Sequence, residues 1–155
     1  MEREKFMQEA INLSIESIAK GGGPFGAVVV KDGEIIAKAS NSVTIDNDPT
    51  AHAEVNAIRA ACRSQKSFTL DGAELYSSCE PCPMCLATAY WAGIKKIYFG
   101  NSREDAAAIN FNDELIYNEI PLNPSARSLP SVQMMRSEAM EAFNIWHAKE
   151  DKVEY

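Results

Sequence analysis

Residues 52–85 read HAEVNAIRAACRSQKSFTLDGAELYSSCEPCPMC, and this stretch guides both the expected fold and the expected chemistry. It begins with His52 and Glu54 and ends with Cys82 and Cys85, which are separated by two residues. Zinc in proteins is commonly bound in a tetrahedron by imidazole nitrogen and thiolate sulfur. One histidine and two cysteines leave the fourth position to water, which is the arrangement of a catalytic zinc site.

Cys79 introduces alternatives, because it precedes Cys82 by three residues and the run also reads C-x-x-C-x-x-C. A structural zinc site with three cysteines and one histidine, or an iron–sulfur cluster, could use that run. Cys82 and Cys85 could instead form a redox dithiol. His52 and Glu54 favour the catalytic zinc site, and we expect Cys79 to end a strand outside the ligand set.

The predicted ligands are expected at helix N-termini, where free backbone N–H groups stabilise negative charge. This position lowers the pKa of a thiol and favours the thiolates of Cys82 and Cys85. A zinc ion can lower the pKa of its water to about 7. A carboxylate close to that water can accept its proton, and we assign this role to Glu54.

Composition limits the class of protein. A length of 155 residues suits one domain with a sizeable core, and we expect 1–155 to form it. The net charge of −7 gives little gain from counterion release, so nucleic acid is not expected as the main partner. The start, MEREKFMQEA, has no signal-peptide apolar region, and no apolar run approaches the roughly 20 residues that span a bilayer. We therefore expect a cytoplasmic protein without a membrane partner, and cysteines assigned to metal agree with a reducing compartment.

The pattern of apolar residues predicts alternating helices and strands of the α/β class. An amphipathic helix is expected over 2–20, and Gly21-Gly22-Gly23-Pro24 ends it. Asp32-Gly33 predicts a tight hairpin turn. The other expected elements are strands at 25–30, 34–39, 73–77, 95–99 and 132–136, a loop at 40–51, and helices at about 51–63, 84–92, 113–120 and 137–149. Ser137 is the expected N-cap of the last helix, whose buried stripe would be Ala139, Met140, Phe143 and Trp146.

These motifs resemble the cytidine and deoxycytidylate deaminase superfamily, in which H-x-E followed by P-C-x-x-C is typical. Within it, the chain is similar to the small bacterial guanine deaminases. The similar segments are 22–37, 47–55, 78–86, 111–113, 116–120 and the terminal Glu154-Tyr155. The FND of residues 111–113 and the terminal tyrosine indicate the guanine branch. Relatives that act on tRNA adenosine typically carry Leu where this chain has Cys79, and they are usually more basic.

The resemblance implies a fold and a metal. The fold is a three-layer αβα sandwich with a five-stranded mixed sheet. One Zn2+ ion per subunit is held by His52, Cys82 and Cys85. Glu54 moves the proton of the attacking water to the ring and then to the departing amine.

The resemblance also implies a purine pocket. Asn41 and Asp113 hold the edge of the base, and Asp113 assists proton transfer to the leaving amine. Phe25 and Trp91 match aromatic positions near the base. Tyr155 closes the pocket, and the C-terminal segment crosses to the partner subunit, so a swapped homodimer is expected.

The implied reaction is hydrolytic deamination of guanine to xanthine and ammonia. The superfamily motifs leave related substrates open, namely guanosine, cytosine or an amino-triazine. Deamination of tRNA adenosine is a further alternative, which the acidic composition disfavours. A zinc-stabilised binding module without catalysis is another, and a fourth protein ligand at Cys79 would favour it.

Overall fold

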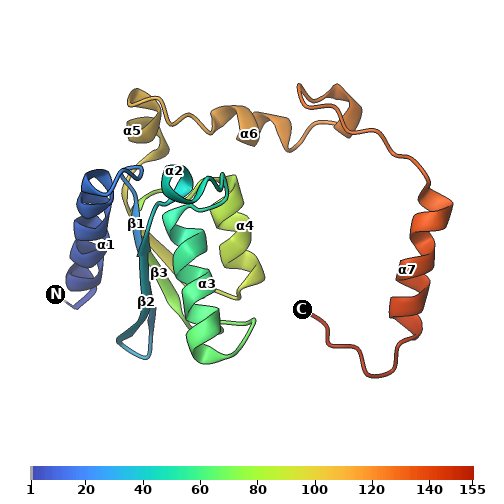
Figure 1. Ribbon diagram of the computed structural model, residues 1–155, viewed down its shortest axis with the longest axis horizontal. Coiled ribbons are helices and arrows are strands. Elements are labelled where there is room, and N and C mark those ends of the chain that lie inside the picture. Colours follow the sequence, from blue (N-terminus) through green and yellow to red (C-terminus); the bar gives the residue numbers. More distant parts are fainter. Residues whose placement is uncertain (1) are drawn as a thin grey trace. The chain divides into compact units, whose positions relative to one another are not determined.

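The computed structural model describes residues 2–155, which divide into two compact units that meet at Asp113 and Glu114. The first unit, ending at Asp113, contains α1 (Glu2–Ala19), β1 (Gly26–Lys31), β2 (Glu34–Ser40), α2 (Val43–Asp46), α3 (Ala53–Gln65), β3 (Glu74–Cys79), α4 (Pro83–Trp91), β4 (Lys96–Asn101) and α5 (Arg103–Ala108) (Figure 1). The second unit contains α6 (Glu114–Glu119), a 3-10 turn η1 (Pro124–Ala126) and α7 (Arg136–Ala148).

The strands of the first unit form one mixed sheet in the order β2-β1-β3-β4. β1 pairs antiparallel with both β2 and β3, whereas β3 and β4 are parallel. The parallel pair encloses α4, so the β3-α4-β4 segment is the crossover unit that the sequence predicted. The turn between β1 and β2 has positive φ at Asp32 (53°) and Gly33 (81°), which confirms the predicted hairpin.

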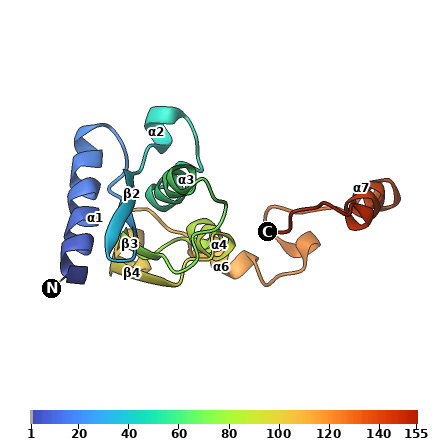
Figure 2. The same ribbon diagram turned by 90° about the horizontal axis from the view of Figure 1, so that it is seen from below.

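Alternate residues of β1 face opposite sides of the sheet. Val28 and Val30 pack with Ala10 of α1, and Ala27 and Val29 pack with α3 and α4. Figure 2 shows α1 on one side of the strands and α3 on the other. Both faces of the sheet are therefore covered by helices, and the alanine-rich inner side of α3 allows that helix to approach the strands closely.

The prediction of a fifth strand is wrong, because the sheet of the described residues has four strands. Residues 131–135 have no regular structure, and Val132 and Met134 are exposed. Local apolar character favoured a strand there, but no neighbouring strand supplies the ladder of hydrogen bonds that a strand requires.

The last helix was also predicted incorrectly in its details. α7 begins at Arg136 after Met135 in a left-handed conformation (φ 52°), so Ser137 is not its N-cap. The expected stripe is not buried, since Phe143 is 70% exposed and Trp146 is 43% exposed. No residue of α7 is buried, so this stripe is not covered within the unit 114–155.

Two short helices were not expected. α2 lies within the predicted loop, and α5 follows β4 directly. Ser102 and Asp105 form a capping box at the start of α5, a sequence signal that could have identified this helix. Among the helices of residues 2–155, none is both long and apolar enough to cross a membrane.

Candidate metal centre

The predicted metal ligands lie at the starts of two helices. His52 is the N-cap residue of α3, in an extended conformation, and Cys82 is the N-cap residue of α4, with Pro83 in the first turn. The Cys85 amide lies 3.5 Å from Cys82 Sγ and donates to it. The helix termini therefore hold the side chains on rigid elements and place N–H groups beside a sulfur, as the sequence predicted.

The three ligand side chains converge on one point. Cys82 Sγ lies 3.5 Å from Cys85 Sγ and 3.5 Å from His52 Nδ1, and Cys85 Sγ lies 3.4 Å from His52 Nδ1. A tetrahedral zinc ion with usual bond lengths needs ligand atoms roughly 3.5–3.8 Å apart. The donor set and its spacing therefore fit one zinc ion.

Hydrogen bonding and charge set the protonation of this cluster. The hydrogen bond between the sulfurs of Cys82 and Cys85 lowers the pKa of Cys82 to about 4, and His52 acts in the same direction. The same sulfur–sulfur contact, together with burial, raises the pKa of Cys85, and the contact with Cys82 raises the pKa of His52. A cation that binds both sulfurs takes them as thiolates, so metal binding releases the thiol protons.

Glu54 lies beside the cluster in the first turn of α3 and is only 5% exposed. Its Oε2 atom is 3.3 Å from Cys85 Sγ, and its Oε1 atom accepts a hydrogen bond of 2.9 Å from the Ser77 hydroxyl. Burial raises the pKa of Glu54, which the hydrogen bond from Ser77 partly offsets. A carboxyl with a raised pKa next to a metal site is suited to receive and release a proton.

Cys79 is outside the metal cluster, as expected. It is the last residue of β3, and its Sγ atom lies 3.7 Å from the carbonyl oxygen of Ser102. The group of side chains in residues 2–155 that can hold a metal ion consists of His52, Cys82 and Cys85. Burial raises the pKa of the Cys79 thiol to about 11.

Comparison with known proteins identifies the family that has this arrangement of metal ligands. A family model for the cytidine and deoxycytidylate deaminase zinc-binding region matches residues 1–101. The chain belongs to this family. Family members bind zinc, so the deaminase is a zinc-dependent hydrolase, and the clustered His52, Cys82 and Cys85 can hold one ion.

Individual relatives differ in how much of the chain they match. The deaminase is 47% identical to the guanine deaminase of Bacillus subtilis over 156 residues, which is 100% of both chains. The X-ray structure of guanine deaminase from Bacillus subtilis matches with a TM-score of 0.96 and covers 100% of this chain and 99% of that one. A tRNA-specific adenosine deaminase of Aquifex aeolicus is 46% identical over 99 residues, 64% of this chain and 66% of the relative. The second likeness is thus confined to part of the chain.

The side chain of Asn41 has a fixed orientation. Its Oδ1 atom accepts hydrogen bonds from the backbone N–H groups of Gly23 (3.1 Å) and Val43 (3.2 Å). The next residue, Ser42, donates its N–H to the carbonyl of Ala51, directly before the metal ligand of α3. Because Oδ1 is occupied, the side chain presents its Nδ2 group as a donor.

Phe25 and Asp113 also belong to this part of the deaminase. The backbone carbonyl of Phe25 accepts a hydrogen bond from Asn41, and its ring contacts Phe111 edge to face with centroids 4.9 Å apart. This contact holds the segment that leads to Asp113. Burial raises the pKa of Asp113, and the negative charge of Cys82 raises it further.

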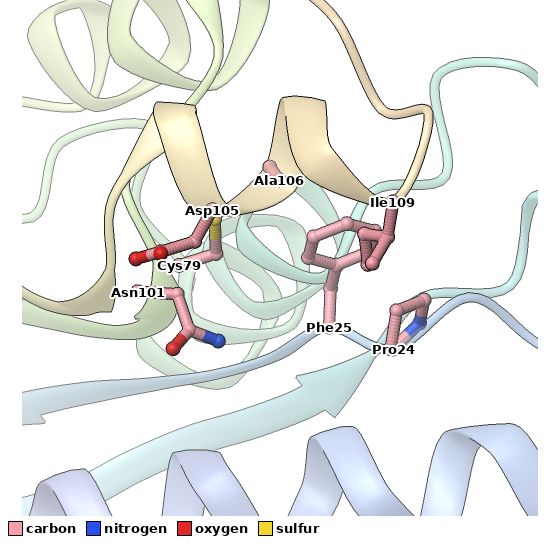
Figure 3. A pocket seen from close by; sticks show the side chains of 7 residues that line it. All are labelled: Pro24, Phe25, Cys79, Asn101, Asp105, Ala106 and Ile109. Atoms are coloured by element: carbon pink, nitrogen blue, oxygen red, sulfur yellow. The ribbon is translucent and has the colours of Figure 1, made fainter.

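A cavity of about 270 Å³ lies beside Phe25. Figure 3 shows the side chains that line this cavity, among them Pro24 and Phe25 before β1, Cys79 at the end of β3 and Ile109 directly after α5. None of the metal ligands lines this cavity. The cavity therefore does not include the metal ligands, and Phe25 links it to Asn41 through a backbone hydrogen bond.

The structure does not bring Trp91 to the metal ligands. Trp91 is the last residue of α4, roughly 12 Å along the helix axis from its first residue, and it is 70% exposed. Tyr155 belongs to the second unit and is 85% exposed. Their pocket roles stay predictions. Conversely, sequence reasoning missed Ser77, because its contact with Glu54 depends on how β3 packs against α3.

Proposed function

We propose that this deaminase converts guanine and water to xanthine and ammonia. The main support is the likeness over the whole length to a protein named guanine deaminase, combined with a zinc-type donor set that is already assembled. The tRNA-specific relative matches only 64% of the chain, and the acidic charge of −7 disfavours a polyanionic substrate.

The proposed mechanism assigns a task to each residue. His52, Cys82 and Cys85 hold zinc, which when bound supplies an acidified water at neutral pH. Glu54 accepts one water proton through Oε2, the oxygen on the cluster side, and delivers it to ring atom N3. It then accepts the second proton from the oxygen bound to C2 and passes it to the amino group on C2. The amino group leaves as ammonia, and C2 keeps the oxygen from water.

We assign the purine edge to Asn41 and Asp113. The fixed amide of Asn41 offers an N–H donor to an acceptor on the base. Asp113 has a raised pKa, so its carboxyl can exchange a proton with the leaving amine. Phe25 supplies an aromatic surface that Phe111 supports. Trp91 is proposed as a further aromatic contact and Tyr155 as the residue that closes the pocket.

A swapped homodimer is part of this proposal. The second unit has exposed apolar side chains, including Phe143 and Trp146, which a partner subunit could cover. We expect a dimer in light scattering, and an active monomer would contradict it.

Deleting Tyr155 should raise KM about tenfold, the size of one lost contact, and an unchanged KM would remove its pocket role.

The three-layer arrangement and the location are also proposals. Coverage of the sheet by α1 on one face and by α3 and α4 on the other supports three layers. All four cysteines are free, which supports a reducing, cytoplasmic location.

The substrate is tested by ammonia release from zinc-loaded protein. The panel comprises guanine, guanosine, cytosine, adenine and an amino-triazine. We expect kcat/KM for guanine to exceed the others by at least about a hundredfold, because a site that hydrogen-bonds one base leaves its polar groups unpaired with another. Ammonia from a different compound would preserve the zinc chemistry and overturn the pocket assignment. No ammonia from any of them would overturn the proposed function.

A further inference from the structure

We infer that Ser77 is a positioning residue, whose hydroxyl fixes the orientation of the Glu54 carboxylate beside the metal ligands. This inference rests on the proposed function, since Glu54 is the proton carrier there. The Ser77 hydroxyl donates to Glu54 Oε1 over 2.9 Å, and the side chains of both residues are buried.

Ser77 is placed by the sheet rather than by a loop. Its backbone pairs with Ala27 of β1 on one side and Phe99 of β4 on the other, so neighbouring strands flank it in the sheet. Side chains alternate along β3, and the next residue, Ser78, uses its hydroxyl to accept the N–H of Gly26. The hydroxyl of Ser77 is therefore directed at α3 by the strand register.

The contact makes the two carboxylate oxygens of Glu54 unequal. Oε1 is held by Ser77, whereas Oε2 faces Cys85 Sγ at 3.3 Å. A glutamate side chain has several rotamers, and a hydrogen bond to one oxygen selects those that direct the other oxygen toward the metal ligands. Ser77 thus reduces the number of side-chain orientations that Glu54 samples before each proton transfer.

The hydrogen bond from Ser77 also stabilises the Glu54 carboxylate, which is buried away from water. A buried carboxylate without a donor is unfavourable, and a hydrogen bond to a charged group is stronger than one between neutral groups. Without the hydroxyl, Glu54 would turn toward other donors or toward water. The rate of proton transfer would fall, whereas guanine binding and zinc binding would persist.

The test uses two variants of nearly equal shape. Ser77→Thr keeps the hydroxyl and adds a methyl group. Ser77→Val has a methyl group at the position of the threonine hydroxyl, so the two variants differ only in the hydrogen-bond donor. We expect Ser77→Val to lower kcat roughly ten- to a hundredfold, the rate equivalent of one hydrogen bond to a charged group. KM should stay within about twofold and zinc at one ion per chain, while Ser77→Thr should restore most of kcat. Ser77→Ala replaces Ser77→Val if the larger side chain prevents folding.

Ser78→Ala is the matched control, because it removes a buried hydroxyl from the same strand without touching Glu54. It should lower stability but leave kcat close to that of the unmodified protein. In the Glu54→Gln background, Ser77→Val should cause little further loss of rate. Equal kcat for Ser77→Thr and Ser77→Val, or a loss of zinc in Ser77→Val alone, would overturn the inference.

A crystal structure of zinc-loaded Ser77→Val gives a readout that does not depend on turnover. We expect Glu54 to occupy a different rotamer or more than one, whereas Ser77→Thr should keep the single orientation. An unchanged Glu54 would overturn the positioning role. If the unmodified protein released no ammonia from guanine, the proposed function would fail, but the orientation of Glu54 in these crystals would still test Ser77.

Discussion

The units on either side of the Asp113–Glu114 boundary use their apolar side chains differently. In the first unit, Leu70, Leu75 and Val29 are fully buried in a shared core. Every residue of 114–155 is described, and none is buried, although Phe143 and Trp146 are large and apolar. The first unit is thus specified by its own contacts, whereas the second has apolar surface that only further contacts can cover.

The second unit is nevertheless ordered locally. Arg127 donates to the backbone carbonyls of Glu119, Ile120 and Leu122, and the Glu119 carboxylate accepts the N–H of Ser128. These hydrogen bonds define a turn but bury no core. The difference shows that backbone and polar contacts can shape a segment whose stability must come from packing elsewhere.

The largest effect is expected where the first unit holds its metal. Replacing Cys85, which is fully buried, with alanine should abolish zinc binding and activity and lower the free energy of unfolding by several kcal/mol, because metal binding is coupled to folding. Metal analysis and urea denaturation measure both. Cys79→Ala is the control and should keep one zinc ion per chain. Retained zinc in Cys85→Ala would contradict the proposed ligand set.

A pair of truncations compares the two units directly. Leu75→Ala should lower the free energy of unfolding by about 3 kcal/mol, as expected for a large side chain in a packed core. Phe143→Ala should cost less than about 1 kcal/mol in dilute protein, because its side chain is 70% exposed. Urea denaturation at several protein concentrations measures both.

The dependence of these unfolding free energies on protein concentration distinguishes the two units further. If a partner subunit covers Phe143, then Phe143→Ala should weaken the dimer, and its cost should grow as the protein concentration rises. An equal cost of the two truncations at all concentrations would show that the second unit packs as the first one does, and the contrast between them would be lost.

A further small effect, which depends on pH, is expected at Tyr76 on the opposite face of the sheet. Burial and the hydrogen bond to Glu74 raise the pKa of Tyr76 to about 12. A raised pKa means that the neutral phenol stabilises the fold up to the usual tyrosine pKa of about 10, and this stabilisation is lost as the pH rises through the folded value. Tyr76→Phe should cost about 1 kcal/mol at pH 8. The difference from the unmodified protein should shrink between about pH 10 and 12 in urea denaturation. A constant difference would exclude this role.

The metal centre could be predicted from sequence because its determinants are local. The helix starts at His52 and Cys82 follow from short motifs, and convergence of their ligands needs only two helices over one sheet. The Ser77–Glu54 contact was not predictable, since it joins residues 23 positions apart through the register of β3. Strand structure at 132–136 was predicted from local propensity, which fails where no neighbouring strand is present.

We propose that Glu54 carries the protons in a zinc-dependent deamination of guanine. It is tested most directly by measuring ammonia release and zinc content in the unmodified protein and in Glu54→Gln. We predict one zinc ion per chain in both proteins and a loss of guanine turnover of at least about a hundredfold in the variant, the usual contribution of a general acid–base group. Equal turnover in the two proteins at equal zinc content would contradict the account.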